Sequence, residues 1–163
     1  MSVLRNRFSI DRKDGSGALR VSCRDAMPGK YEISTDPARF EVDLIHEFLS
    51  TSYWAEGRPR DVVERSIRHS LCFGVFDKER QIAFARVITD RAVFGYLADV
   101  FVVPAYRSKG ISKGLMAAIL EHPDVKGLTL LLLRTRDAHG LYAQFGFAPV
   151  PNADEMMARY GPA

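Results

Sequence analysis

The feature that most constrains the fold is a strand pattern, a helix pattern and a second strand pattern that follow one another over residues 93–135. The first, VFGYLADVFVVP at 93–104, is an apolar strand ended by Pro104, and ISKGLMAAILEH at 111–122 has apolar residues at helical spacing. The run GLTLLLLRT at 127–135 is continuously apolar, a pattern typical of a strand buried on both faces. Two strands joined through a helix lie parallel in one sheet, so the segment predicts an α/β crossover.

The elements around this segment complete a mixed α/β order of strand, two helices, three strands, helix, strand, helix and strand. Short polar turns and proline breaks separate the elements. The other predicted elements are a strand at 31–35, helices at 40–50 and from Pro59, hairpin strands at 70–77 and 81–90, a helix at 137–146 and a strand at 147–150.

Composition bounds the class of protein. The 163 residues suit one domain, and 47% hydrophobic with 26% charged residues excludes a largely disordered chain. Neither an apolar run near the ~20 residues of a membrane helix nor a signal peptide is evident, so we expect a cytoplasmic protein with no membrane partner. Cys23 and Cys72 give no disulfide framework, and the scattered histidines give no metal-ligand spacing.

Charge is concentrated at the start of the chain. Residues 1–30 contain seven Lys or Arg and three Asp, and their apolar periodicity is weak. We predict a basic N-terminal extension over 1–30, partly disordered, and a single domain over 31–163. A nucleic-acid or anionic partner for the extension is the alternative, but the sequence has no nucleic-acid reading motif, which favours a solvated leader.

The loop between the predicted strand at 93–104 and the next helix is a candidate anion site. Arg107, Lys109 and Lys113 supply positive charge, and Gly110 lets the backbone approach a ligand at the helix N-terminus. A pyrophosphate suits such a site, although an ordinary glycine turn explains the pattern equally well. Ser112 breaks a GxGxxG pattern, and no Walker pattern is present.

The run YRSKGIS at 106–112 resembles the acyl-CoA loop of the GNAT (GCN5-related) N-acetyltransferases, whose pattern is [R/Q]xxGx[G/A]. Arg107 and Gly110 match, whereas Ser112 replaces Gly or Ala by another small residue. LYAQFGF at 141–147 resembles the closing helix and strand of that family. The resemblance runs from about residue 31 to the end of the chain, and it implies the GNAT-type acyltransferase fold, a mixed sheet with splayed middle strands flanked by helices.

The resemblance also implies acetyl-CoA as acyl donor and a primary amine as acceptor, and the histidine spacing already favours no metal. It places the pantetheine arm against the backbone of Phe101, Val102 and Val103. It assigns the pyrophosphate to Arg107 and to the backbone N–H groups of Ser108, Lys109, Gly110, Ile111, Ser112 and Lys113.

Three roles remain for the chemistry: the resemblance suggests groups for the first two, and the position of Asp99 within an apolar strand suggests the third. A backbone N–H near Val102 would stabilise the oxyanion. Tyr142 would protonate the leaving thiolate, or else pack as an aromatic ring beside Phe145. Asp99 would take the proton of the amine, directly or through water, or else be a structural carboxylate paired with an arginine such as Arg86.

Residues that face the acceptor are expected in the loop between the first two helices. Tyr53, Trp54 and Arg58 there would bind the acceptor, or else Tyr53 and Trp54 would pack as a lid.

The sequence therefore predicts an enzyme that moves an acetyl group from acetyl-CoA to a primary amine of a small molecule by direct attack in a ternary complex. A non-catalytic acyl-CoA-binding module of the same fold is the alternative. Protein amines as acceptors and a homodimer stay open.

Overall fold

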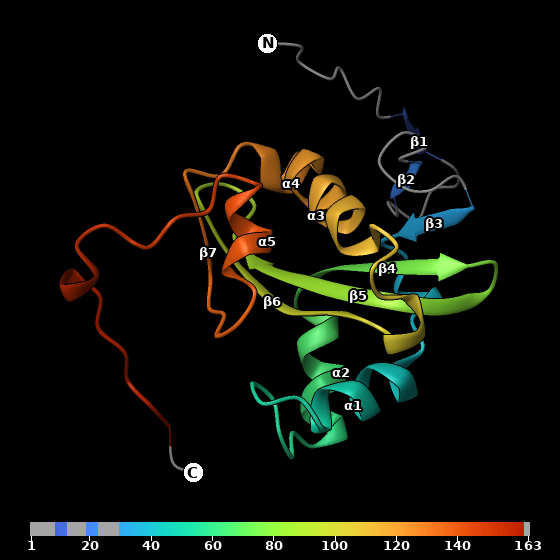
Figure 1. Ribbon diagram of the computed structural model, residues 1–163, viewed down its shortest axis with the longest axis horizontal. Helices are drawn as coiled ribbons and strands as arrows, with labels where there is room; N and C mark the ends of the chain where they lie inside the picture. The colour runs from blue at the N-terminus through green and yellow to red at the C-terminus, as the bar shows by residue number, and fades with distance from the viewer. Residues whose placement is uncertain (1–8, 13–18, 23–29, 162–163) are drawn as a thin grey trace.

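The computed structural model describes residues 9–12, 19–22 and 30–161, and its centre is a seven-stranded sheet in which the strand order follows the chain (Figure 1). Neighbouring strands are antiparallel except the last pair, β6 and β7, which is parallel. The strands are β1 (Ser9–Arg12), β2 (Leu19–Ser22), β3 (Tyr31–Ser34), β4 (Leu71–Asp77), β5 (Arg80–Thr89), β6 (Phe94–Val102) and β7 (Leu130–Leu133).

Helices cover both faces of the sheet and bury two separate apolar clusters. Figure 1 shows α1 and α2 on one face and α3 and α4 on the other. The α1–α2 face buries Phe84 and Phe101, whereas the α3 face buries Val87 and Leu97. The helices are α1 (Val42–Ser50), α2 (Arg60–Arg68), α3 (Ile111–Glu121), α4 (Pro123–Lys126) and α5 (His139–Ala143), with short 3₁₀ turns at Pro37–Arg39, Pro104–Tyr106 and Ala153–Glu155.

The predicted mixed α/β order is confirmed from β3 to α5, including the tight hairpin and the crossover. Lys78 takes a positive φ of 59° in the two-residue turn that joins β4 to β5. The chain then leaves β6, passes through α3 and α4, and returns as β7 parallel to β6. Proline ends β6, as expected, because Pro104 cannot extend the ladder. No described helix has the length and apolar character needed to span a bilayer.

Two expectations about strands are wrong. β7 is an edge strand with Leu130 48% exposed, not a strand buried on both faces. The strand expected at 147–150 is absent, because after Gly146 turns with φ +84° the chain leaves the sheet without pairing. No element was predicted before residue 31, whereas β1 and β2 pair in turn onto β3. The domain boundary at residue 31 stays a prediction.

Candidate active site

The site begins at an irregularity between β5 and β6. Arg86 pairs with Ala98 and Phe84 pairs with Phe101, so β6 holds one residue more than β5 in this stretch. Such a β-bulge bends a strand and redirects a side chain. Asp99 accommodates it with a φ of 53°, a conformation that aspartate adopts more readily than most residues.

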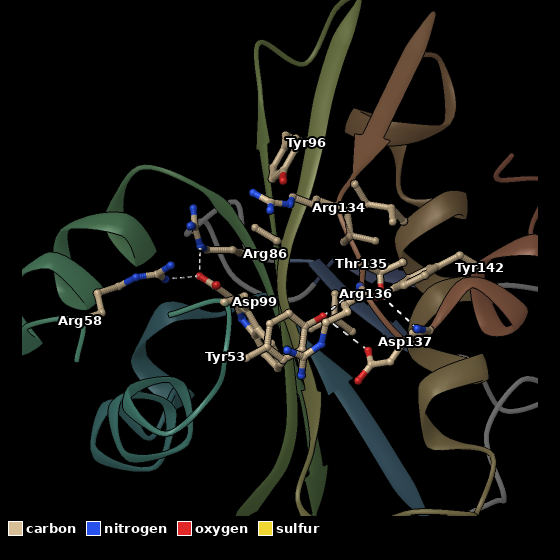
Figure 2. Close-up of a pocket in the computed structure, with 16 residues that line it drawn as sticks. Tyr53, Arg58, Arg86, Tyr96, Asp99, Arg134, Thr135, Arg136, Asp137 and Tyr142 are labelled. Carbon is tan, nitrogen blue, oxygen red and sulfur yellow. Dashed lines mark hydrogen bonds and ion pairs between the residues drawn. The ribbon is translucent and has the colours of Figure 1, made fainter. Parts of the chain in front are cut away.

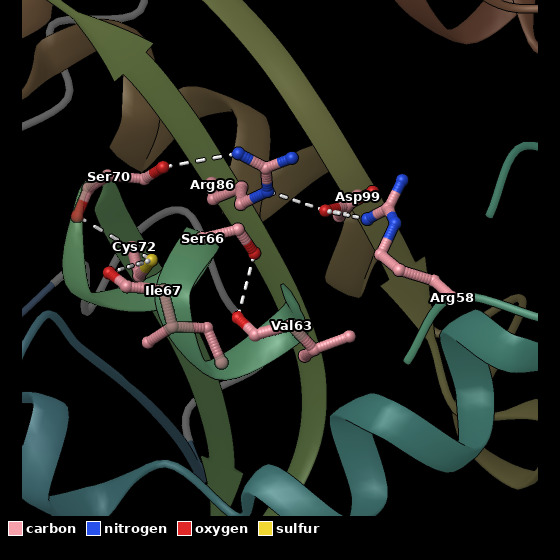
Figure 3. A network of polar contacts seen from close by, with 8 residues as sticks. All are labelled: Arg58, Val63, Ser66, Ile67, Ser70, Cys72, Arg86 and Asp99. Atoms are coloured by element: carbon pink, nitrogen blue, oxygen red, sulfur yellow. Dashed lines mark hydrogen bonds and ion pairs between the residues drawn. The ribbon is translucent and has the colours of Figure 1, made fainter. Parts of the chain in front are cut away.

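The bulge buries the Asp99 carboxylate between two arginines from different elements (Figure 3). Its Oδ2 accepts a hydrogen bond from Nε of Arg86 at 2.5 Å and another from Nη1 of Arg58 at 2.9 Å. The Asp99 side chain is only 2% exposed, and Arg86 also donates to Oγ of Ser70 at 3.2 Å. The structure therefore contains the Asp99–Arg86 pair considered as one alternative from the sequence, and adds Arg58 to it.

Beyond the bulge, β6 and β7 separate and open a cleft of about 770 Å³ (Figure 2). Their pairing ends at Leu97 and Leu133, although β6 continues to Val102. The cleft is lined by the α1–α2 loop, the middle of β5 and β6, the segment after β7 and the helix α5. The lining residues are Tyr53, Trp54, Arg58, Arg86, Tyr96, Leu97, Ala98, Asp99, Val100, Leu133, Arg134, Thr135, Arg136, Asp137, Ala138 and Tyr142.

The α1–α2 loop is tied to the segment after β7 by Tyr53. The Tyr53 hydroxyl accepts the backbone N–H of Arg136 at 3.1 Å and donates to Oδ1 of Asp137 at 3.4 Å. The Arg136 guanidinium lies 3.9 Å from the centre of the Tyr53 ring, and Trp54 meets that ring edge-on. The three expected acceptor residues, Tyr53, Trp54 and Arg58, all line this one cleft.

Tyr142 reaches the same cleft from α5. It is 9% exposed, its ring packs edge-on against Phe147 at 5.8 Å, and burial raises the pKa of its hydroxyl to about 12. The phenol is therefore protonated throughout the neutral range, as a proton donor requires.

The residues of the expected anion loop, Arg107 to Lys113, are not among those that line the cleft. Gly110 is the N-cap of α3 with φ +77°, and no atom lies within 4 Å of where a Cβ would stand. The first helical hydrogen bond runs from Gly114 N–H to Gly110 O, so the N–H groups of the first turn, Ile111 to Lys113, precede it. An open glycine backbone at a helix N-terminus suits a phosphate.

The basic side chains of this loop are engaged with its own backbone. Nε of Arg107 donates to Val102 O at 3.2 Å, and Nζ of Lys109 donates to Ala105 O at 2.9 Å. Ser108 takes a positive φ of 61°.

Backbone alternation sets the direction of the Val102 N–H. The Val103 N–H donates to Ile82 O of β5 at 2.9 Å. Successive N–H groups of an extended strand point to opposite sides, so the Val102 N–H points away from β5, toward the side that β7 has left.

Sequence reasoning missed the roles in the cleft of Tyr96, Arg134 and Arg136. The signal was available in RTRD at 134–137, where charged residues follow an apolar strand directly. Ligand-binding residues commonly stand at the carboxyl ends of parallel strands. Within the described residues, no group of three His, Cys, Asp or Glu side chains could hold a metal ion.

Comparison with known proteins identifies the class. Residues 68–149 match the acetyltransferase (GNAT) domain family. A crystal structure of a GNAT-family protein from Xanthomonas campestris pv. campestris is 50% identical, with a TM-score of 0.80 over 83% of this chain and 96% of that one.

Two sequence relatives agree. The chloroplastic GCN5-related N-acetyltransferase 1 of Arabidopsis thaliana is 30% identical over 86% of this chain and 79% of its own length. A protein of Gibberella zeae whose name places it among the acetyltransferases is 32% identical over 57% of this chain, and the match spans 64% of that relative. The chain belongs to the GNAT acetyltransferase family.

Proposed function

We propose that the protein transfers the acetyl group of acetyl-CoA to a primary amine of a small molecule by direct attack in a ternary complex. The observation that carries this proposal is the separation of β6 and β7 beyond Leu97 and Leu133. It leaves a cleft with Tyr142 at one wall and the acceptor loop, Tyr53 to Arg58, at the other. Donor and acceptor can then meet from opposite faces of the sheet.

The donor side uses backbone groups. The N–H groups from Ser108 to Lys113, with Arg107, would hold the pyrophosphate, and the open Gly110 conformation supports this assignment. The backbone of Phe101 to Val103 would pair with the pantetheine amides along the free edge of β6. Acetyl-CoA supplies an activated thioester to this site.

The chemical step forms one C–N bond and breaks one C–S bond. The Val102 N–H, turned away from β5, would donate to the carbonyl oxygen as negative charge develops there. Tyr142 would donate its proton to the departing thiolate. The amine proton would pass to Asp99 or to water, and Oδ1 is the Asp99 oxygen that neither arginine bonds.

Thiol release from acetyl-CoA across a panel of small primary amines tests the proposal, with the acetylated product identified by mass. The Gly110→Val variant is the matched control, because it blocks the donor loop. Release that depends on the amine and is lost in the variant supports acetyl transfer. Stabilisation by acetyl-CoA without product from any amine would instead favour the non-catalytic acyl-CoA-binding module.

A further inference from the structure

Positive charge dominates the acceptor side of the cleft. Four arginines and two aspartates are among the residues that line it. Asp99 is shared by Arg58 and Arg86, and Asp137 accepts a hydrogen bond from the Tyr53 hydroxyl. Like charges held close together repel, and an anionic ligand relieves that repulsion.

Two of these arginines lie near a small residue of β6. Arg86 pairs with Ala98 across β5 and β6, and paired residues of neighbouring strands share a face of the sheet. Arg134 follows Leu133, where the pairing of β6 with β7 ends. Arg86, Ala98 and Arg134 line the same cleft and form a row there.

That row faces the acceptor loop. Arg86 is two residues from Phe84, whose ring belongs to the apolar cluster beneath α1 and α2. Figure 2 shows the guanidinium groups of Arg58, Arg86 and Arg134 on the same side of β6. Ala98, the small residue paired with Arg86, lines the cleft together with both arginines.

The arginines retain hydrogen-bonding capacity. Arg58 gives one recorded hydrogen bond, through Nη1, and Arg86 gives two, through Nε and Nη1, so each guanidinium has further N–H donors. Within the described residues, Arg134 makes no ion pair or side-chain hydrogen bond. Guanidinium groups bind carboxylates and phosphates through paired hydrogen bonds.

We infer that the acceptor carries an anionic group, a carboxylate or a phosphate, close to its amine, and that this group binds above Ala98 between Arg86 and Arg134, with Arg58 at the rim. The inference rests on the proposed function and names its substrate class. Anion binding here fixes the acceptor in register with the cleft, so that its amine faces the end of β6 where the thioester is expected.

Matched amine pairs test the inference. O-phosphoethanolamine is compared with ethanolamine, and β-alanine with 3-aminopropan-1-ol, each by kcat/KM from thiol release. Each pair is also compared by Kd in the presence of CoA, which needs no turnover. We expect the anionic member of at least one pair to be favoured about tenfold or more, the scale of one charge-assisted hydrogen bond. The pair with the larger preference distinguishes phosphate from carboxylate.

Arg134→Gln removes the arginine that has no ion pair in the described structure. It should lower the ratio of kcat/KM for the anionic amine to that for its neutral counterpart about tenfold, mainly by raising KM for the anionic amine. The Kd of acetyl-CoA should stay within about twofold of the parent value. Arg134→Lys should retain part of the preference, because it keeps the charge without the planar fork. Arg65→Gln, an exposed arginine of α2 outside the cleft, is the matched control and should keep the full ratio.

Equal kcat/KM and equal Kd within both pairs would overturn the inference. So would an Arg134→Gln protein that binds acetyl-CoA weakly and keeps its acceptor preference, since the arginine would then serve the donor. Tighter binding of the anionic amine without acetyl transfer would support the inference and count against the proposed function instead.

Discussion

The Asp99 carboxylate and the Arg86 guanidinium bond at 2.5 Å across the register shift between β5 and β6, so a distortion of the sheet and a buried charge pair coincide. Arg58 joins the same oxygen from the α1–α2 loop. The Asp99 carboxylate and its two arginines therefore fix the acceptor loop to β6, the strand whose free edge would pair with acetyl-CoA. Any change to Asp99 acts on both sides of the cleft.

We expect Asp99→Asn to lower the free energy of unfolding by about 3 kcal/mol, because it leaves two guanidinium groups without their buried carboxylate. Asparagine also tolerates a positive φ, so the bulge itself should survive. Urea unfolding measures the loss, and Asp137→Asn, an exposed change, should cost about 0.5 kcal/mol or less. Normal stability with kcat reduced at saturating acceptor would show that Asp99 acts as the base rather than as a structural partner.

We expect Gly110→Val to abolish stabilisation by acetyl-CoA, which for the parent protein should be about 2.7 kcal/mol at a hundredfold excess over Kd. Nothing in the protein obstructs a side chain at Gly110, so the loss of binding would reflect blocked approach of the ligand. Valine at φ +77° also costs about 1–2 kcal/mol. Gly57→Val controls for that cost, since Gly57 has φ +66° and equally open surroundings. Full stabilisation of the Gly110→Val protein would refute the loop assignment.

The sequence predicted the order of elements and the crossover because both depend on local periodicity and on proline and glycine breaks. It did not predict that β7 is an edge strand, since LLLL reads alike whether one or two strands flank it. Arg86 was one alternative partner of Asp99 from the sequence. The bulge that buries the carboxylate and the second arginine, Arg58, 41 positions away, leave no local pattern. Arg134 was missed because its importance comes from the cleft that it shares with Arg58 and Arg86, which are distant in the sequence.

Burial raises the pKa of the Cys72 thiol from 9.0 to about 12. The unfolded chain therefore loses this proton first as the pH rises. The stability that the buried, protonated thiol contributes to the fold is intact below pH 9. It is lost progressively as the pH rises toward 12. At one pH unit above the unfolded value the loss is about 1.4 kcal/mol. Between pH 8 and pH 10 we expect the free energy of unfolding of the parent protein to fall about 1.4 kcal/mol more than that of Cys72→Ala, which has no thiol to titrate. An equal fall of the unfolding free energy with pH in the two proteins would contradict this prediction.

We predict that removing residues 2–29 costs less than about 2 kcal/mol of stability. In the described part of this segment, β2 meets β3 through two register pairs, whereas β3 pairs with β4 through four. The buried residues of β3, Ile33 and Ser34, lie outside the deletion. Thermal unfolding of the truncated chain is the measurement, and Ile33→Ala, expected to cost about 2–5 kcal/mol, calibrates the scale. A larger loss on truncation would mean that the extension packs as part of the domain.

Tyr142→Phe tests the final proton transfer. Because burial raises the pKa of the phenol to about 12, Tyr142 stays protonated at neutral pH and must act through a placed hydrogen bond that strengthens as sulfur gains charge. Phenylalanine keeps the ring and its edge-on contact with Phe147 but removes that donor. We expect kcat to fall roughly 10²-fold while the Kd of acetyl-CoA changes little.

The stability of the Tyr142→Phe protein distinguishes two explanations of a fall in kcat, loss of a proton donor and loss of packing. A folded Tyr142→Phe protein with parental stability and low kcat supports the proton donor, whereas a parallel loss of stability would indicate packing. The pH profile adds a second criterion. A phenol with a pKa of about 12 cannot produce an alkaline limb between pH 7 and pH 10, so any limb there should persist in the variant. Undiminished kcat in Tyr142→Phe would remove Tyr142 from the mechanism and leave solvent as the source of the proton.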